Sequence, residues 1–292
     1  MNPDIVTFGR GGWRRDGEPW QPERPFYAVL GDPIAHSLSP LMQNAALDDR
    51  ELPHEYVALQ VAGEHLAALK RACRDGLLAG FNVTAPHKEA VAALCDRRTV
   101  QAGELGAVNT VKVQDGAWIG HNTDSGGVLT VLSQVWAGAT LPVRGVVLGA
   151  GGSGRAALDA LLRWGVPDLE LRNRSAAGRE RIEAWLARRG LADRVRVLPL
   201  EAHREPPPTI PAVWICCLAG GVPCAPYLPV AAGPDPAVLL DLRYGDQRPP
   251  QAPPLGFKIE DGLSVLMMQG GLSFGWWFGP PIPWTAMRDA LT

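Results

Sequence analysis

The sequence predicts an α/β protein of two domains, and three features of its 292 residues carry this prediction. Patterns typical of buried strands alternate with helical patterns along most of the chain. A glycine-rich turn, Gly149 to Gly154, lies between an apolar strand and a helix in the second half. The hydrophobic content of 46% is enough to fill two cores of ordinary size.

Composition argues against several classes of function. Thirty acidic and 28 basic side chains give a net charge of −2 without a long like-charged block, so no nucleic-acid partner is expected. The five cysteines contain no Cys-x-x-Cys pair and the six histidines lack ligand spacing, so neither a disulfide framework nor a metal site is indicated. A cytoplasmic location is the simplest expectation.

Two stretches bear on membrane targeting. No residue from Gly262 to Met287 is charged, but the apolar part, Leu263 to Phe278, falls short of the ~20 residues that a span needs. A buried helix is the better interpretation, and no membrane partner is expected. Residues 1–24 lack the apolar core of a signal peptide, and their Gly, Pro and Trp content predicts an N-terminal extension that is flexible or lies along the surface.

The N-terminal half opens with a predicted strand, Phe26 to Leu30, that leads to Ser37-Leu38-Ser39-Pro40. Ser39 is a good N-cap and Pro40 a good first residue for a helix. A helix start that carries the hydroxyls of Ser37 and Ser39 suits a carboxylate ligand. A second strand is expected over residues 54–59 and a second helix over residues 64–74.

Leu77 to Phe81 is typical of a buried strand, and its end presents Asn82 and Thr84 on one face because strand side chains alternate. Pro86 is expected as the first residue of the next helix, with Lys88 in the first turn. The unpaired N–H groups there disfavour an ammonium, so Lys88 is placed to exchange a proton near neutral pH. A lysine that simply faces solvent is the alternative.

Asp115-Gly116 between two alternating segments predicts a β-hairpin. Gly106 to Val113 forms its first strand and Ala117 to Gly120 its second. The second strand leads to Asp124, which either caps the following helix or has a role in chemistry.

The second half contains a strand–helix–strand unit around the glycine turn, with strands at Val143 to Leu148 and Asp168 to Arg172. In this context the glycines let backbone N–H groups approach a pyrophosphate, as in a Rossmann-type dinucleotide domain. The second strand ends in Arg172-Asn173-Arg174-Ser175, with Arg179 a turn later, where an NAD site would offer an acidic residue. NADP is therefore favoured over NAD, and a solvated helix start is the alternative.

Further strands are expected at residues 194–198, 212–217 and 238–240. Proline-rich surface segments, residues 206–208 and 249–254, lie between and after them. The last helices start at Leu263 and Trp284, and the first of them has Gln269 beside its apolar stripe.

Taken together, these segments resemble the shikimate dehydrogenase family from about Phe26 to the C-terminus. The matching blocks, in family order, are Ser37-Leu38-Ser39-Pro40, Asn82-Val83-Thr84 to Pro86-His87-Lys88, Gly106-Ala107-Val108-Asn109-Thr110, Asn122-Thr123-Asp124, the glycine turn, Asn173-Arg174-Ser175, and Asp261-Gly262-Leu263 with Gln269-Gly270.

The resemblance implies NADP-dependent interconversion of 3-dehydroshikimate and shikimate by a monomer or homodimer. It implies a substrate-binding domain over residues 25–124 and 263–292, and an NADP-binding Rossmann domain, doubly wound, over residues 125–262. Lys88 and Asp124 are implied as the catalytic pair, and no metal is expected. The implied substrate-binding residues are Ser37, Ser39, Asn82, Thr84, Asn109, Tyr244 and Gln269. The implied cofactor-binding residues are Gly149, Ala150, Gly151, Gly152, Ser153, Asn173, Arg174, Ser175, Arg179, Leu218 and Gly262.

The chain departs from the family pattern on the cofactor side. Cys216-Cys217-Leu218 replaces a run of hydrogen-bonding residues, and Ser264 stands where a glycine is usual. A helix expected near residues 249–258 is interrupted by prolines. These changes favour, as one alternative, a substrate-binding or regulatory protein that no longer transfers hydride. A quinate or aminoshikimate dehydrogenase is another, because the same hydroxyl-binding groups would serve each ring, and a folate-linked or other dehydrogenase of similar architecture is a third.

Overall fold

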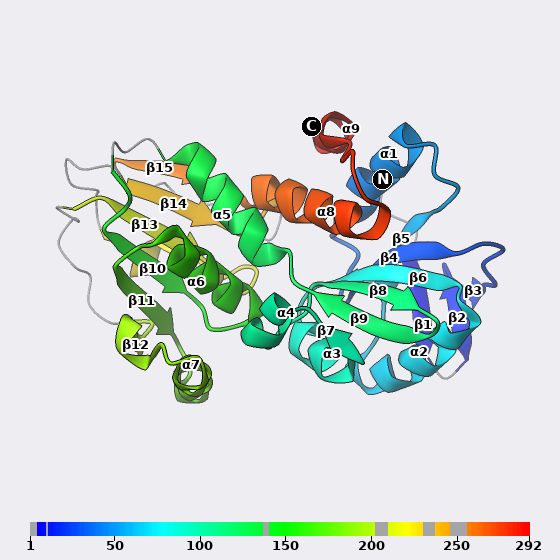
Figure 1. Ribbon diagram of the computed structural model, residues 1–292, viewed down its shortest axis with the longest axis horizontal. Helices are drawn as coiled ribbons and strands as arrows, with labels where there is room; N and C mark the ends of the chain where they lie inside the picture. The colour runs from blue at the N-terminus through cyan, green and yellow to red at the C-terminus, as the bar shows by residue number, and fades with distance from the viewer. Residues whose placement is uncertain (1–4, 10, 137–139, 202–209, 230–236, 246–255) are drawn as a thin grey trace. The chain divides into compact units, whose positions relative to one another are not determined.

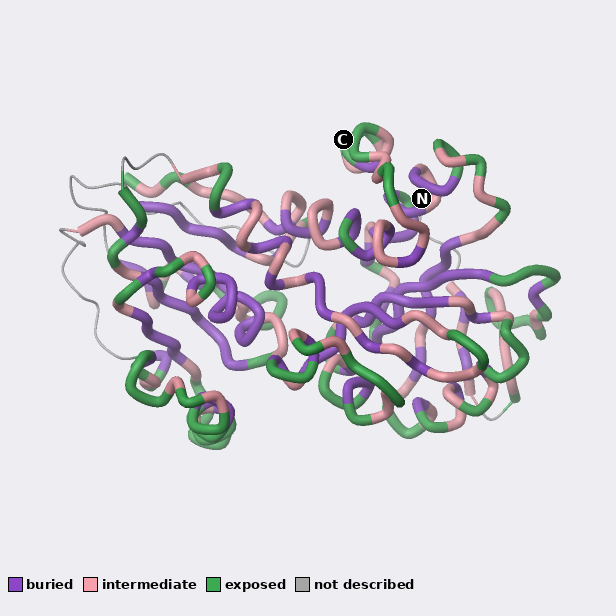
Figure 2. The backbone as a smooth tube through the Cα atoms, viewed as in Figure 1, coloured by how far each residue is buried: buried purple, intermediate pink, exposed green. Residues whose placement is uncertain are grey.

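The computed structural model describes residues 5–9, 11–136, 140–201, 210–229, 237–245 and 256–292. The chain divides into two compact units, Met1–Thr123 with Gln269–Thr292, and Asp124–Met268. Figure 1 shows the elements of each unit, and Figure 2 shows that the central strands of both sheets are buried. The proline-rich segments at residues 206–208 and 249–254 lie outside the described residues.

Within the described residues, the first unit has a nine-stranded mixed sheet in the order β3-β2-β1-β5-β4-β6-β8-β9-β7. Its strands are β1 (Ile5–Gly9), β2 (Gly12–Arg15), β3 (Glu18–Pro19), β4 (Phe26–Gly31), β5 (Tyr56–Gln60), β6 (Leu78–Val83), β7 (Arg97–Arg98), β8 (Thr110–Gln114) and β9 (Ala117–His121). Its helices are α1 (Ser39–Asp49), α2 (Leu66–Ala72), α3 (Lys88–Leu94), α4 (Val100–Leu105) and α9 (Trp284–Asp289), with short 3₁₀ turns η1 (Gly63–His65) and η2 (Cys73–Asp75).

Helices cover both faces of this sheet. On one face α2 and α3 bury apolar side chains of β1, β4, β5 and β6. On the other face α1, α9 and the second half of α8 (Gly262–Phe278) pack above the strands (Figure 1). The Trp277 ring of α8 lies so close that a Cβ on Gly80 of β6 would come within 2.9 Å of it. Close packing of α8 on β6 therefore depends on this glycine.

The expectation of a flexible N-terminal tail was wrong for the described residues that form β1, β2 and β3. β1 pairs parallel with β5, and β2 and β3 extend the same sheet as antiparallel strands. Val6 is fully buried and Phe8 is 8% exposed, and the Phe8 ring lies 4.8 Å from the ring of Trp13. The alternation of apolar residues over Ile5–Gly9 was the overlooked signal, because composition alone does not reveal a strand period.

Two helices begin at other residues than the sequence suggested. Leu38 is the N-cap of α1, so Ser39 is already helical. α3 begins at Lys88 with His87 as its N-cap, and Pro86 lies in the preceding turn, where the His87 N–H donates to Thr84 O at 3.0 Å. Prolines favour both the first turn of a helix and the turn before it, which explains the difference.

The predicted hairpin was confirmed: β8 and β9 pair antiparallel through a two-residue turn at Asp115 and Gly116. Both turn residues have positive φ, 52° and 74°. This backbone matches the twist of a two-residue hairpin, and Asp-Gly adopts it readily.

The described part of the second unit has a six-stranded parallel sheet in the order β12-β11-β10-β13-β14-β15, as in a Rossmann fold. Its strands are β10 (Arg144–Leu148), β11 (Asp168–Asn173), β12 (Val195–Pro199), β13 (Ala212–Cys216), β14 (Ala237–Asp241) and β15 (Phe257–Glu260). α5 (Asp124–Val135) and α6 (Gly152–Trp164) lie side by side against it, and α7 (Ala176–Arg188) packs on β11 and β12 (Figure 1). The 3₁₀ turns are η3 (Ala192–Arg194) and η4 (Ala225–Tyr227).

The boundaries between the units differ from those expected. The N-terminal strands belong to the first unit, and the division within α8 falls after Met268 rather than at its start. The last strand, β15, was not expected, because a helix interrupted by prolines was inferred for that region. No helix in the described ranges is long and apolar enough to cross a membrane, and α8 has 17 residues.

Phe8→Ala tests whether the N-terminal strands are part of the folded unit. Removing this buried ring should lower the free energy of unfolding by about 3 kcal/mol. Val100→Ala, at a side chain that is 79% exposed, is the control and should change it by less than about 0.5 kcal/mol. Urea unfolding followed by tryptophan fluorescence measures both. Equal stability of Phe8→Ala and the parent protein would contradict a packed β1.

Candidate functional site

A cluster of hydrogen-bonded amides and hydroxyls lies where β6 and β9 end in the first unit. Asn82, near the end of β6, stands opposite Thr110 of β8 in the antiparallel register. Its Nδ2 donates to Thr110 Oγ1 at 3.1 Å and to Asn109 O at 3.1 Å. Its Oδ1 accepts from Tyr56 Oη at 2.8 Å. Because buried polar groups must be paired, these bonds fix the orientation of the amide.

Asn109 is the centre of this cluster. Its Oδ1 accepts from the Thr123 N–H at 2.8 Å and from Thr110 Oγ1 at 2.9 Å. Its Nδ2 donates to Thr123 Oγ1 at 2.9 Å and to Gln269 Oε1 at 3.1 Å. Asn109 is 1% exposed, whereas Gln269 is only half-buried. Two of the predicted substrate-binding residues are therefore in direct contact.

Ser273 completes the cluster and was not predicted. The α8 backbone places it one turn beyond Gln269, whose carbonyl accepts from Ser273 Oγ at 2.9 Å. The same hydroxyl lies 2.8 Å from Thr110 Oγ1 and 2.9 Å from Asn82 Nδ2. A serine four residues after Gln269 on an apolar helix was the available signal.

Ser37 and Ser39 lie at the start of α1, and both are nearly buried. The Ser39 N–H donates to Ser37 Oγ at 3.3 Å, so the hydroxyl just before the N-cap Leu38 accepts from the first N–H of the helix. One turn later, Gln43 Nε2 donates to Gly270 O at 3.0 Å, next to Gln269. This bond joins the helix that carries the two serines to the helix that carries Gln269.

Lys88 is the first residue of α3, half-buried, and follows the buried His87. Its carbonyl accepts from the Val108 N–H at 3.0 Å, which ties the start of α3 to the segment just before Asn109. Thr84 lies between β6 and α3, and its methyl group packs so closely on Gly31 that a Cβ there would come within 2.6 Å. The backbone that carries Thr84 and Lys88 is thus held from two sides.

Two histidines near these residues are uncharged at pH 7. Burial lowers the pKa of His121, which ends β9, and its Nδ1 lies 3.0 Å from Thr99 Oγ1. Burial also lowers the pKa of His36, which precedes Ser37. Neither imidazole therefore adds positive charge to this part of the unit.

The glycine turn of the second unit is held together by close backbone contacts. Gly149 has φ 111°, and a Cβ there would lie 2.7 Å from Cys217 O. A Cβ on Gly154 would lie 2.1 Å from Gly149 O, which no side chain could tolerate. A Cβ on Gly151, the N-cap of α6, would meet nothing within 4 Å. Two glycines are therefore needed for packing, and the open position beside the helix start is the cradle expected for a pyrophosphate.

The segment after β11 is ordered by its own side chains. Asn173 Oδ1 accepts from the Ala150 N–H at 3.2 Å, which links this segment to the glycine turn. Ser175 is the N-cap of α7, where Oγ accepts from the Gly178 N–H at 3.2 Å. Arg179 Nη1 donates to the carbonyls of Asn173 and Arg174, at 2.9 and 3.1 Å. Arg174 itself is exposed.

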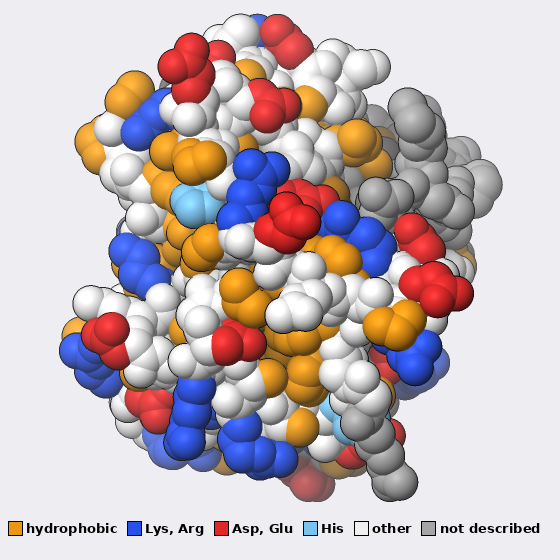
Figure 3. Space-filling view, turned by 90° about the vertical axis from the view of Figure 1, so that its right-hand side faces the viewer, with side chains coloured by type: hydrophobic (Ala, Val, Ile, Leu, Met, Phe, Trp, Pro, Cys, Tyr) orange, Lys and Arg blue, Asp and Glu red, His pale blue; other side chains and the backbone are white. Residues whose placement is uncertain are grey.

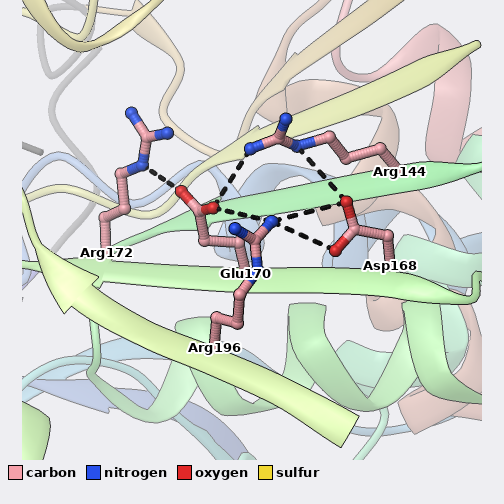
Figure 4. Close-up of polar contacts among 5 residues, drawn as sticks. All are labelled: Arg144, Asp168, Glu170, Arg172 and Arg196. Atoms are coloured by element: carbon pink, nitrogen blue, oxygen red, sulfur yellow. Dashed lines mark hydrogen bonds and ion pairs between the residues drawn. The ribbon is translucent and has the colours of Figure 1, made fainter. Parts of the chain in front are cut away.

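Arg172 belongs to a different structure (Figure 4). It is 1% exposed, and its Nε donates to Glu170, whose side chain is fully buried. Arg144 Nη2 and Arg196 Nη2 lie 3.1 and 3.2 Å from Glu170 Oε2, and Asp168 joins both arginines. Arg172 therefore belongs to an ion network centred on the buried Glu170, which also includes the partly exposed Arg196 and Asp168.

The remaining predicted residues lie at the carboxyl ends of β13 and β14 or at the start of α8. Leu218 and Tyr244 are half-buried. Gly262 donates its N–H to Arg243 O at 3.2 Å, and a Cβ there would lie 2.2 Å from Leu242 O. Asp124 begins α5 in the second unit, whereas Lys88 belongs to the first, so their pairing stays a prediction.

Side chains of both charge signs are spread over the face drawn in Figure 3. Lysines and arginines alternate there with acidic and apolar side chains, in keeping with a net charge of −2. No single-sign surface distinguishes that face, and the two polar sites described above remain the candidates for function.

Gly154→Ala tests the packing inferred for the glycine turn. The added methyl group would overlap Gly149 O, so the free energy of unfolding should fall by about 2 kcal/mol. Gly151→Ala is the matched control, because its methyl group enters open space, and should cost less than about 1 kcal/mol. Denaturant unfolding measures both, and equal losses in the two variants would be inconsistent with the described turn.

Comparison with known proteins identifies the family of this chain. A family model described as the shikimate dehydrogenase substrate-binding domain matches residues 29–111. A shikimate dehydrogenase (NADP(+)) from Geobacter metallireducens is 35% identical over 272 residues, which cover 89% of this chain and 93% of the relative. One from Anaeromyxobacter sp. is 37% identical, over 91% of this chain and 95% of the relative.

Solved structures give the same result. The shikimate 5-dehydrogenase from Thermus thermophilus, in complex with NADP(H) and shikimate, is 31% identical with a TM-score of 0.71, covering 91% of this chain and 98% of that chain. The 5-ketofructose reductase of Gluconobacter sp., in ligand-free form, is 28% identical with a TM-score of 0.75, covering 92% and 98%. The relatives span both units of this protein, and the chain belongs to the shikimate dehydrogenase family.

Proposed function

We propose that this protein is an NADP-dependent shikimate dehydrogenase that interconverts 3-dehydroshikimate and shikimate. The observation that carries the proposal is the hydrogen bond between Asn109 and Gln269. This pair belongs to the cluster of amides and hydroxyls in the first unit, and the residue before Asn109 is hydrogen-bonded to the backbone of Lys88. Such groups suit a ring that carries several hydroxyls, since each can donate and accept. Relatives that span both units bear the same name.

The second unit supplies a site that fits NADP. Its glycine turn leaves the backbone open at Gly151, and exposed Arg174 follows β11 without an acidic residue beside it. NADP would accept or return the hydride. Arg174, assisted by Asn173 and the capping Ser175, would hold the 2′-phosphate, and Arg179 would order the segment that carries them.

Hydride transfer must be accompanied by transfer of one proton, the proton of the substrate hydroxyl, and the protein's own residues would carry this out. Withdrawal of a hydride from an alcohol carbon requires loss of the hydroxyl proton, and Lys88 would accept it at Nζ and return it in the reverse reaction. Asp124 would orient the substrate hydroxyl and the ammonium. Both groups are proposed to meet at the reacting oxygen when substrate is bound.

Recognition of the acid would come from the hydroxyls of Ser37 and Ser39, together with Tyr244. Thr84, Asn109 and Gln269 would bind the ring hydroxyls. The amide of Asn82 already forms hydrogen bonds with four neighbouring residues. Asn82 would therefore hold the cluster in place in addition to binding the substrate ring.

Quinate and an aminated shikimate are alternative substrates, because the same hydroxyl-binding groups would serve each ring. A shikimate-binding protein without activity is a further alternative. It is favoured by the loss of polar groups at Cys216-Cys217-Leu218. Ser264 argues less strongly for it, since its hydroxyl donates to Glu260 within the same unit. We place the protein in the cytoplasm as a monomer or homodimer.

Reduced-nicotinamide absorbance tests this proposal directly. Purified protein mixed with shikimate and NADP should form NADPH, and NAD or quinate should give less than about a tenth of that rate. Faster turnover of quinate would favour the alternative substrate. Binding of shikimate by calorimetry without any turnover would contradict the enzymatic proposal.

Lys88→Ala should lower turnover by about 10²-fold or more while the affinity for shikimate changes little, because a proton acceptor is lost and the binding groups stay. Lys112→Ala removes an ammonium from β8 in the same unit and is the control, with near-normal turnover expected. Steady-state rates and calorimetry measure both effects. Near-normal turnover in Lys88→Ala would refute the role of this lysine.

A further inference from the structure

Arg243 is a buried cation two residues beyond the end of β14 and has no part in the reaction proposed above. It is 4% exposed. Its Nε and Nη2 donate to the two carboxylate oxygens of Asp241, each at 2.8 Å. Such a bidentate pair has a fixed geometry, so the position of the guanidinium is set by the strand.

The remaining face of the guanidinium is directed at a loop. Arg243 Nη1 donates to the carbonyls of Val222 and Ala219, the latter at 3.3 Å. Both belong to the segment 217–224 that follows β13, which we call the β13 loop. Residues 217–223 read Cys-Leu-Ala-Gly-Gly-Val-Pro, so apart from one thiol this stretch has no polar side chain to hold it. The loop has one backbone bond of its own, from the Val222 N–H to Ala219 O at 3.2 Å, and the guanidinium adds side-chain hydrogen bonds to two of its carbonyls.

The β13 loop forms a wall of the glycine turn. The Cys217 N–H donates to Leu148 O at 2.8 Å, at the last residue of β10. Cys217 O would lie only 2.7 Å from a Cβ built on Gly149, so the loop backbone packs directly on this glycine. A shift of this loop would therefore move the backbone against which the turn packs.

Arg243 also contacts the start of α8 through its backbone. Its carbonyl accepts from the Gly262 N–H at 3.2 Å. One residue thus joins the end of β14, the β13 loop and the first residue of the last long helix. Tyr244, a predicted substrate-binding residue, follows it directly in the chain.

A metal site is the other interpretation of this region, and the structure argues against it. Ligand atoms of Cys216, Cys224 and Asp241 lie within 4.8 Å of one another. Both oxygens of Asp241 already accept from Arg243. A hydrogen bond with Cys224, together with burial, raises the pKa of Cys216. A metal cation bound here would lie beside the positive guanidinium and would compete with it for both oxygens of Asp241, so it would be poorly held.

We propose that Arg243 is a positioning residue that holds the β13 loop against the glycine turn and so preforms the cofactor site. The inference rests on the proposed function, because it assigns the turn to NADP. Loosening of the β13 loop can also be measured directly, without any turnover, as the rate at which Cys224 is alkylated.

Arg243→Met is the principal variant, compared with Asp241→Asn/Arg243→Met and Arg189→Met. The double variant removes the buried carboxylate charge that the single variant leaves unpaired, so it separates loss of the loop bonds from a general loss of stability. Arg189→Met is the matched control: it breaks another arginine–aspartate pair of the same unit, with Asp159 at 3.1 Å, away from the β13 loop.

Two readouts test the inference. NADPH fluorescence titration should show about tenfold weaker binding in Arg243→Met and in the double variant, by the usual worth of charge-assisted hydrogen bonds. Alkylation by iodoacetamide, followed by mass spectrometry, should become at least about fivefold faster at the buried Cys224 in both variants. Cys95, in the first unit, is the internal standard, and Arg189→Met should change neither readout. Arg243→Lys should recover part of the NADPH affinity.

NADPH affinity within twofold of the parent protein in Arg243→Met would overturn the inference. So would a double variant that regains full NADPH affinity, because the effect would then come from the unpaired carboxylate. A parent protein that binds NADPH but does not oxidise shikimate would refute the proposed function alone, and both readouts would still decide the role of Arg243.

Discussion

The hydrogen bonds of one buried amide, that of Asn109, hold the polar cluster of the first unit together. Asn109 is almost fully buried, and every atom of its amide takes part in a hydrogen bond. These bonds connect the segment after β9, the start of β8 and the second half of α8, and the Asn109 carbonyl adds β6 by accepting from Asn82 Nδ2. An amide so placed cannot rotate without leaving several partners unsatisfied, which would cost about 1–3 kcal/mol for each buried group. The position of Gln269 therefore follows from packing that exists without substrate.

A different constraint governs the second unit, where backbone atoms approach one another too closely for side chains. A Cβ atom added at any of three glycines would lie only 2.1 to 2.7 Å from a backbone carbonyl oxygen; these are Gly149, Gly154 and Gly262. These contacts join the glycine turn to the β13 loop and α8 to the end of β14. Arg243 holds the β13 loop from the other side. The open surface at Gly151 thus lies between segments that are fixed by steric contact and by one ion pair.

Much of the fold followed from patterns with a local cause. Asp115-Gly116 fixed the hairpin, and the glycine turn in its strand–helix context indicated the parallel sheet. What failed depended on partners distant in the chain. The N-terminal strands are stable because Val6 and Phe8 pack on β5 and its neighbours, and β15 forms because β14 offers an edge to it. The role of Ser273 depends on its hydrogen bonds to residues of β6 and β8, which lie far from it in the chain. Arg172 is held in the ion network by its ion pair with Glu170.

Transfer of a hydrogen atom between substrate and cofactor tests the central claim most directly. Shikimate deuterated at the carbon that becomes the ketone should be incubated with NADP and the protein, and the NADPH formed should be analysed by mass spectrometry. Direct hydride transfer predicts NADPH that carries one deuterium per molecule. NADPH without deuterium, or no NADPH at all while shikimate binds, would contradict the account of this protein as a shikimate dehydrogenase.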